Sequence, residues 1–180
     1  MSLDDQPPRP VSEYREFMAP APLAASFLCL WSQTISGSRG VYQHRVLPDG
    51  CIDIVFINEE PPIVVGPWTV SFVARLAAGS NITGARLHPG RASSLLGIPA
   101  SELLNQSIPV ADIRGAAPKM RFEKVIGQPN AAARRCAVAQ ALLASIEPSI
   151  RCDQAVLASI QWLARHPQGS DRTIEPLDRD

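Results

Sequence analysis

The feature that most constrains the fold is a series of short apolar segments from Phe27 to Pro89, separated by glycine and proline turns. Within the segments polar and apolar residues alternate as they do in β-strands, and the turns are too short to hold helices. The pattern therefore predicts a sandwich or a small barrel, with a cupin-like arrangement as one option, and disfavours βαβ units. We expect the strands at 27–35, 40–47, 51–57, 61–65, 70–76 and 81–87.

Beyond Pro89 the pattern becomes helical, so the predicted fold class is α+β, with a C-terminal helical region. The alanine-rich stretch that begins at Asn130 predicts the longest helix, capped by Asn130 and stopped before Pro148. Shorter helices are expected at 90–97, 100–106, 119–127 and 152–166, the second of them with Ser101 at its cap. Residues 1–12 are expected to form a disordered leader, followed by an irregular arm.

Composition limits the classes of function. The 17 basic and 17 acidic residues balance, whereas a domain that holds DNA by itself usually carries a basic surplus. No apolar run approaches the length that crosses a bilayer, and the acidic, proline-rich start is unlike a signal peptide. The four cysteines form no CxxC pair. We expect a cytoplasmic protein with reduced thiols, no membrane partner and no cofactor.

The stretch "HRVLPDGCIDIVF", residues 44–56, groups several polar side chains within an apolar region. Proline, aspartate and glycine in "LPDG" are typical of a turn, so Asp49 is read as a turn former in preference to a ligand. Strand alternation then puts Cys51, Asp53 and Val55 on one face and Ile52, Ile54 and Phe56 on the other. The second face is core, and Asp53 faces either water or a polar-lined cavity.

Neither metal chemistry nor nucleophilic catalysis is indicated. A cupin-type metal centre needs about three imidazole or carboxylate ligands, and only His44 and His88 lie in the β region. No GxSxG motif is present, and a strand cysteine is more often inert packing than a reactive thiolate. We predict no catalytic residue and no metal ligand, so the chain is not expected to be an enzyme.

A ligand inside the β domain would lie against aromatic walls with a few orienting polar groups. Several of the candidate residues could instead have an ordinary structural role. Trp31 and Phe72 could belong to the core, and Trp68 could cover a sheet edge. Arg45 and Arg86 could face the solvent. An Arg86–Asp53 pair across two strands would satisfy both charges. The candidate ligand-binding residues are Trp31, Tyr42, Arg45, Asp53, Trp68, Phe72, Arg86 and His88.

The long predicted helix also carries a seam of small and apolar residues spaced by four, three, four and three. Such a seam packs a helix onto its own domain or onto a second subunit, and both readings stay open. The seam consists of Ala132, Cys136, Ala139, Leu143 and Ile146.

Four segments, in this order, carry a resemblance to a known family: "YREFMAPAPLAASFLCLW", "HRVLPDGCIDIVF", "VVGPWTV" and "GARLHPGRASSLLGIPASELLNQSIPVADI". They resemble the N-terminal sensor region in one branch of the AraC-type transcriptional regulators of bacteria. The match covers about 100 residues with its spacing intact. Residues 149–180 are similar to the opening of that family's helix-turn-helix DNA-binding region.

The resemblance implies a sensor domain at 13–115, a helical linker or dimerisation segment at 116–148 and the start of a truncated DNA-binding region at 149–180. It implies an unknown small-molecule effector, a homodimer, and promoter DNA contacted only through a recognition helix that these 180 residues lack. Asp178 stands where the family usually has alanine. Either the chain is a fragment of a longer regulator or it is naturally short. The alternatives are a stand-alone small-molecule-binding module and, with less support, a cupin-like metal enzyme.

Overall fold

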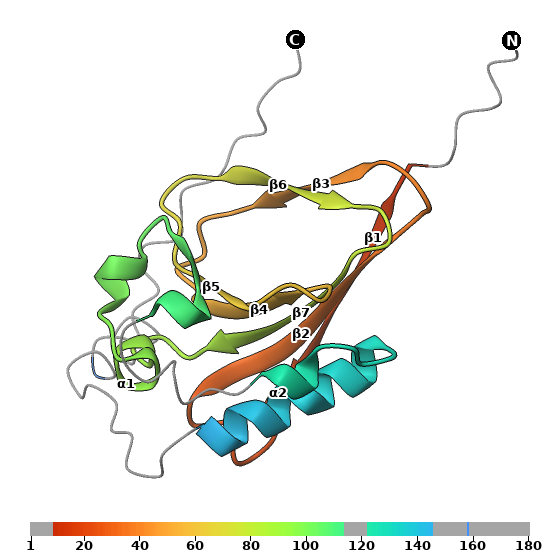
Figure 1. Ribbon diagram of the computed structural model, residues 1–180. Helices are drawn as coiled ribbons and strands as arrows, with labels where there is room; N and C mark the ends of the chain where they lie inside the picture. The colour runs from red at the N-terminus through yellow and green to blue at the C-terminus, as the bar shows by residue number, and fades with distance from the viewer. Residues whose placement is uncertain (1–8, 114–121, 146–157, 159–180) are drawn as a thin grey trace, which may run out of the picture.

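A computed structural model of the chain describes residues 9–113, 122–145 and 158, and its main element is a six-stranded antiparallel sheet (Figure 1). The strand order is β1-β2-β7-β4-β5-β8, so strands far apart in the sequence become neighbours. The strands run over Val11–Met18 (β1), Phe27–Ser36 (β2), Asp53–Ile57 (β4), Ile63–Val65 (β5), Asn81–Leu87 (β7) and Ser107–Pro109 (β8).

A second sheet consists of two antiparallel strands, β3 (Val41–Val46) and β6 (Phe72–Ala77). It lies over one face of the large sheet, at the top of Figure 1. The predicted α+β class is therefore confirmed. The arrangement is an open pair of sheets in place of a closed barrel, because β1 and β8 are the two edges of the large sheet in the described part of the chain.

The helix α2 (Ala131–Ser145) covers the opposite face of the large sheet (Figure 1). The predicted cap is confirmed, since the Asn130 side-chain oxygen accepts a hydrogen bond from the Ala133 backbone N–H at 2.9 Å. The main core lies between this helix and the sheet, where Ile54, Val64 and Leu142 have no exposed surface. Burial of this apolar layer supplies most of the driving force for folding.

The strand alternation predicted for residues 51–56 is confirmed. Ile52, Ile54 and Phe56 point into the helix-covered core, whereas Asp53 and Val55 point toward the two-stranded sheet. The Asp49 side chain accepts a hydrogen bond from the Cys51 N–H at 2.9 Å, which confirms its role as a turn former. Gly50 follows it with φ at 70°, a conformation that glycine adopts without strain.

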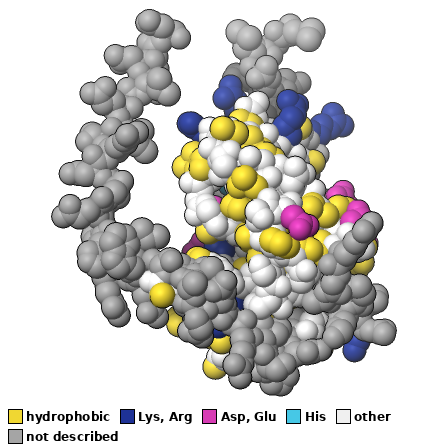
Figure 2. Space-filling model, turned by 90° about the vertical axis from the view of Figure 1, so that its left-hand side faces the viewer, with side chains coloured by type: hydrophobic (Ala, Val, Ile, Leu, Met, Phe, Trp, Pro, Cys, Tyr) yellow, Lys and Arg dark blue, Asp and Glu magenta, His cyan; other side chains and the backbone are white. Residues whose placement is uncertain are grey.

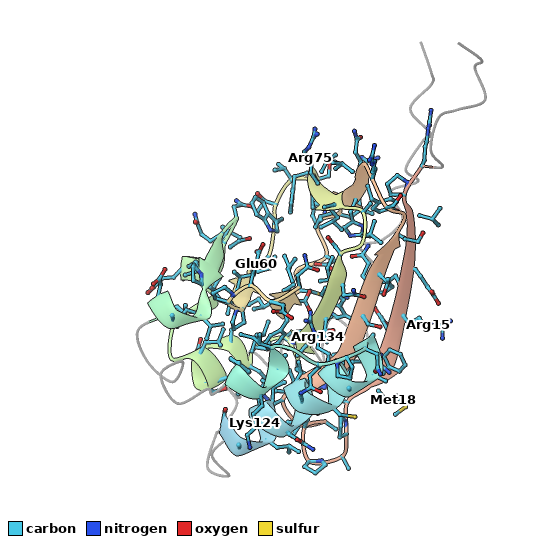
Figure 3. The ribbon with its side chains drawn as sticks, turned by 45° about the vertical axis from the view of Figure 1, so that its right-hand side comes forward. Arg15, Met18, Glu60, Arg75, Lys124 and Arg134 are labelled. Atoms are coloured by element: carbon cyan, nitrogen blue, oxygen red, sulfur yellow. The ribbon has the colours of Figure 1, made fainter. Side chains whose placement is uncertain are left out.

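Other elements differ from expectation. The prediction of an irregular arm is wrong, because this segment forms strand β1, which begins at Val11 and runs along β2. Its charged side chains hid the strand pattern and are typical of an exposed sheet edge. Figure 3 shows Arg15 and Met18 pointing away from this edge. The cap assigned to Ser101 is also wrong: that residue lies inside a short 3-10 helix without side-chain capping.

The remaining helical elements are short. Helix α1 (Ala92–Leu96) confirms the helix expected around 90–97 and ends at Gly97 in the left-handed conformation. The other described elements are the 3-10 helices η1 (Ala100–Leu103), η2 (Val110–Asp112) and η4 (Glu123–Val125). The helix expected at 152–166 and the domain assigned to 149–180 lie outside the described ranges, apart from residue 158. None of the helices that the structure describes has the length and apolar character to cross a bilayer.

Candidate functional site

A cavity of about 530 Å³ lies between the two sheets. Its floor is the face of the large sheet that α2 does not cover, and its roof is the inner face of β3 and β6. The volume falls within the range of small-molecule sites. Most of its wall is apolar, and the aliphatic part of the floor consists of Val55, Ile57, Ile63, Val65 and Ile82.

The polar part of the floor is one row of side chains across the sheet. Strand pairing aligns Cys29, Arg86, Asp53, Val65 and Ser107 on five successive strands. The Arg86 guanidinium binds the Asp53 carboxylate with two hydrogen bonds, Nε to Oδ1 and Nη2 to Oδ2, both 3.1 Å long. The geometry is bidentate, which is the strongest form of this contact. The cross-strand pair predicted as a structural solution is therefore present, at the edge of a cavity.

Trp31 completes the coordination of Asp53 from two strands away. Its indole Nε1 donates to Asp53 Oδ1 at 3.3 Å, so the ring must pass over the intervening strand β7. Gly84 makes this possible, because it is paired with Trp31 and a Cβ there would overlap the indole. The glycine is thus required by close packing. The Trp31 ring lies over Gly84, on the side of the sheet that faces the cavity.

Two more carboxylates lie around Arg86. Asp49 Oδ2 is 3.6 Å from Arg86 Nη2, and Glu16 Oε1 is 3.8 Å from Arg86 Nη1. Glu16 also accepts a 2.7 Å hydrogen bond from the Tyr14 hydroxyl. Both carboxylate side chains remain about half exposed, at 50% for Asp49 and 51% for Glu16, whereas that of Asp53 is 12% exposed. One guanidinium therefore serves three carboxylates.

Burial favours the neutral form of three side chains in the cavity wall, those of Cys51, Tyr14 and His44. Burial raises the pKa of the Cys51 thiol to about 11, with the charges of Asp49 and Asp53 adding to the effect. Burial and the hydrogen bond to Glu16 raise the pKa of Tyr14 above its ordinary value. Burial lowers the pKa of His44, so its ring is neutral at pH 7. For Arg86 the penalty of burial is outweighed by Asp53, and its pKa is raised.

The roof is polar at one point. The Gln33 side-chain nitrogen donates to Ser12 Oγ at 2.8 Å and lies 3.3 Å from His44 Nδ1. Gln33 is only 4% exposed and reaches from β2 to the underside of β3. This contact links the two sheets across the cavity. It assigns the His44 proton to Nε2, because Nδ1 accepts.

Two aromatic rings close one part of the wall. Trp68 and Phe72 lie 4.3 Å apart between ring centroids, and both line the cavity. The Trp68 Nε1 is buried and has no hydrogen-bond partner among the described atoms. An unpaired buried donor is uncommon in a folded protein.

Six of the eight candidate ligand-binding residues line the cavity, and two do not. Tyr42 shares the inner face of β3 with His44 at 6.3 Å between ring centroids, but it lies beyond the cavity. His88 follows the end of β7, where its Nε2 lies 3.1 Å from the Ala24 carbonyl oxygen. The six that line it are Trp31, Arg45, Asp53, Trp68, Phe72 and Arg86.

Arg45 reaches the rim of the cavity from the outer side of the small sheet. Arg75 is exposed on β6 of the same sheet, and Arg39 is exposed just before β3. Figure 2 shows basic side chains gathered at the top of the molecule, where Figure 1 has β3 and β6, while acidic side chains lie lower. The neutral total of the chain therefore hides a basic surface on the two-stranded sheet, and Arg45 belongs to that surface.

Sequence reasoning missed Tyr14, Gln33 and His44 as parts of the cavity wall. For His44 the signal was available, because it alternates with Val46 on one face of β3. Gln33 could have been found the same way, since it alternates with Trp31. Tyr14 was hidden because its segment was not recognised as a strand.

Most of the seam on α2 faces away from the core, and Ala139 is the exception. Ala132, Cys136 and Leu143 are exposed, Ala139 is buried, and Ile146 lies outside the described residues. The helix packs on the sheet through a different face, which includes Ala137, Val138, Ala141 and Leu142. Its role in a subunit interface stays a prediction.

The two β-region histidines are not brought together, since His44 lines the cavity and His88 does not. Among the described residues, histidine, cysteine, aspartate and glutamate side chains form no group of three that could hold a metal ion. The polar groups of the cavity are arranged as hydrogen-bond donors, acceptors and ion pairs. Such an arrangement can orient a bound molecule.

Fold and site together define an α+β domain with a mainly apolar cavity between two antiparallel sheets. The chain belongs to the family described as Domain of unknown function (DUF6597), which matches residues 15–109. Every residue that lines the cavity except Tyr14 lies in this range. No curated protein and no solved structure matches the chain significantly.

Proposed function

We propose that the chain is the effector-sensing and dimerising part of an AraC-type transcriptional regulator, and that the effector binds between the two sheets. The observation that carries the proposal is the cavity of about 530 Å³, whose walls combine aliphatic and aromatic surface with a few fixed polar groups. Each of the four ordered segments that resemble the AraC-type sensor region contributes residues to its wall.

The polar groups that line the cavity in the described part of the chain are better suited to holding a molecule than to reacting with it. The Asp53 oxygens are already occupied by Arg86 and Trp31, so this carboxylate is poorly suited to act as a general base. Burial raises the pKa of the Cys51 and Cys29 thiols, which disfavours their reactive thiolate forms. These features support binding over catalysis.

A sensor must transmit its state, and α2 supplies a route. The helix packs directly against β2 and β7, which form the cavity floor, and its seam residues Ala132, Cys136 and Leu143 face outward. A ligand that favours one arrangement of the sheet would bias the position of this helix through differential affinity. In a homodimer the seam would bring two copies together. Leu143→Arg should then convert dimer to monomer in sedimentation experiments.

The experiment that tests the proposal uses the longest natural form of the protein. Its reading frame should continue past Asp180 into two helix-turn-helix units, and it should retain DNA from upstream of its own gene in a gel shift. A continuation without such units, or no specific retention, would favour the alternative of a stand-alone small-molecule-binding module. The same cavity supports that alternative.

A further inference from the structure

His44 has one ring nitrogen that the protein leaves accessible. The Gln33 side-chain nitrogen lies 3.3 Å from Nδ1 of this ring, and no residue that the structure describes makes a hydrogen bond to the other nitrogen, Nε2. The fully buried side-chain atoms without a partner, among the described residues, are Trp68 Nε1 and Thr83 Oγ1, so His44 Nε2 keeps exposed surface. Because His44 lines the cavity from the inner face of β3, a molecule between the sheets can reach this nitrogen.

The accessible nitrogen is an uncharged donor with a fixed orientation. Nδ1 accepts from Gln33, so the proton of the neutral ring is on Nε2. Burial lowers the pKa of His44, which keeps the ring neutral at pH 7. Gln33 is only 4% exposed and also donates to Ser12 Oγ at 2.8 Å, so the group that orients the ring is itself held on both sides. The roof of the cavity thus presents one oriented N–H group.

The charged side chains of the wall leave no net charge for an ionic ligand to pair with. They are Arg45, Arg86, Asp49 and Asp53, whose formal charges cancel. Arg45 and Asp49 are exposed, so water screens their charges. Asp53 already accepts from Trp31 and from two nitrogens of Arg86. An ionised ligand would lose hydration in this mainly apolar cavity without gaining a matching partner.

From these contacts we propose that the cavity binds a neutral, largely apolar molecule with an acceptor oxygen, and that His44 Nε2–H donates a hydrogen bond to this oxygen. The apolar body lies on the aliphatic floor, below the roof that carries His44. Trp68 Nε1 is a second unpaired donor in the wall, but it is buried, so a ligand does not reach it in this arrangement. The inference rests on the proposed function, namely that the cavity holds a small molecule, and it specifies the class of that molecule.

The test uses four probes built on one phenylbutyl body. Butylbenzene has no polar group, phenylbutanone has an acceptor oxygen, and phenylbutylamine and phenylbutanoate carry a charge. Their affinities for the full chain are measured by titration calorimetry at neutral pH. We expect phenylbutanone to bind more tightly than either charged probe, because the ionised groups pay for lost hydration.

One substitution separates the hydrogen bond from the shape of the cavity. His44→Phe removes the donor and keeps an aromatic ring at the same position. It should weaken phenylbutanone binding about 3- to 10-fold, the effect of one net hydrogen bond, and leave butylbenzene binding unchanged. The matched control is Tyr42→Phe, which removes a polar group beside His44 on β3 but outside the cavity wall, and it should change neither affinity.

The unaltered chain gives a second readout that does not depend on the folding of a variant. Nuclear magnetic resonance of the imidazole nitrogens should find the His44 proton on Nε2. Phenylbutanone should shift the signal of this proton strongly, and butylbenzene should shift it far less. A proton on Nδ1 in place of Nε2 would remove the donor and overturn the inference.

The other outcomes are equally decisive. If His44→Phe weakens the binding of butylbenzene as much as that of phenylbutanone, the residue only shapes the cavity; if it weakens neither, the oxygen lies elsewhere. Tighter binding of a charged probe than of phenylbutanone would refute the preference for a neutral molecule. In these three cases a ligand-binding cavity stands, whereas binding of none of the four probes would contradict the proposed function as well.

Discussion

Removing Arg86 should expose how strongly the cavity floor depends on one ion pair. The Arg86 and Asp53 side chains are 21% and 12% exposed, so Arg86→Met leaves a mostly buried carboxylate with only Trp31 as donor. We expect a loss of about 3 kcal/mol in the free energy of unfolding, measured by urea denaturation. The double variant Asp53→Leu/Arg86→Met should recover most of it, since no charge is then stranded. Equal losses in the single and double variants would contradict this account.

Gly84 should be intolerant of even one methyl group. A Cβ at this position overlaps the Trp31 indole, so Gly84→Ala must displace the ring from its place beside Asp53. The expected loss of stability is about 1–3 kcal/mol, the usual result of overpacking, and it should come with a changed near-ultraviolet circular dichroism spectrum.

The matched test of the Gly84 prediction removes the Trp31 indole, which a Cβ at Gly84 would overlap. In a Trp31→Val background the indole is absent, so Gly84→Ala should cost clearly less than in the natural sequence. If the two costs are the same, the close approach of Trp31 to β7 does not explain the need for glycine.

Cys51 should make the protein less stable in alkali. Its thiol has a pKa of about 11 in the folded protein, against an ordinary value of 9.0. The protonated thiol therefore contributes stability that is present below pH 9.0 and lost as pH rises toward 11. Cys51→Ser, which does not titrate there, should lose less stability over this interval in urea denaturation. Parallel pH profiles for the two proteins would refute the assignment.

At the scale of single residues, the sequence predicts which face of a strand a side chain occupies, but not which residues of other strands it meets. Alternation along "CIDIVF" sufficed to put Asp53 and Ile54 on opposite faces, because side-chain direction within a strand is a local property. The passage of Trp31 over Gly84 depends on the register of β2 against β7, which are more than 40 residues apart. Tyr42 illustrates the same gap, since it lies beside His44 on β3 but does not line the cavity.

At the scale of elements, the same substitution should destabilise the protein strongly on one face of α2 and only slightly on the other. Leu142 is fully buried against the sheet, and its neighbour Leu143 is 39% exposed on the seam. Leu142→Ala should lower the free energy of unfolding by about 3 kcal/mol, as for other buried leucines, and Leu143→Ala by less than about 0.5 kcal/mol. Urea denaturation at low protein concentration checks both values. A large loss from Leu143→Ala there would show that the helix packs differently.

Elements with a strong local signal were predicted well, and those with a weak one were not. Helix α2 was recognisable from its alanine content and its asparagine cap. Strand β1 was missed because Glu13, Arg15 and Glu16 interrupt the apolar alternation, as an edge strand allows. The three-residue strand β8 was also missed, because so short a strand depends on its partner more than on its own sequence, whereas β5 lies within the strand expected at 61–65.

For the whole molecule, the unpredicted feature was how the sheets close. Strand number and turn positions were compatible with a barrel or a sandwich, and the structure separates β3 and β6 from the other six strands. That separation creates the cavity, because the inner face of the two-stranded sheet stands over the floor and Gln33 bridges to His44. Exposed arginines lie on the outside of the two-stranded sheet, and acidic side chains lie lower on the molecule (Figure 2).

The interior of the molecule is divided between two layers that one sheet separates. On the helix side, Arg134 is buried and donates to the Asn81 carbonyl oxygen at 3.2 Å, reaching from α2 toward β7 (Figure 3). Arg135 lies 3.6 Å from the centroid of the Phe17 ring and joins the same helix to β1. These contacts hold the helix side closed, so a ligand is expected only on the opposite face.

The most direct measurement is the change in methyl resonances of the chain during a titration with phenylbutanol, followed by nuclear magnetic resonance. Alternating residues of β4 and β5 report on the two layers: Val55 and Val65 face the cavity, and Ile54 and Val64 face the helix. The account predicts that the resonances of Val55 and Val65 shift with a common saturation curve while those of Ile54 and Val64 stay in place. Shifts confined to Ile54 and Val64, or no shift at any of the four, would contradict it.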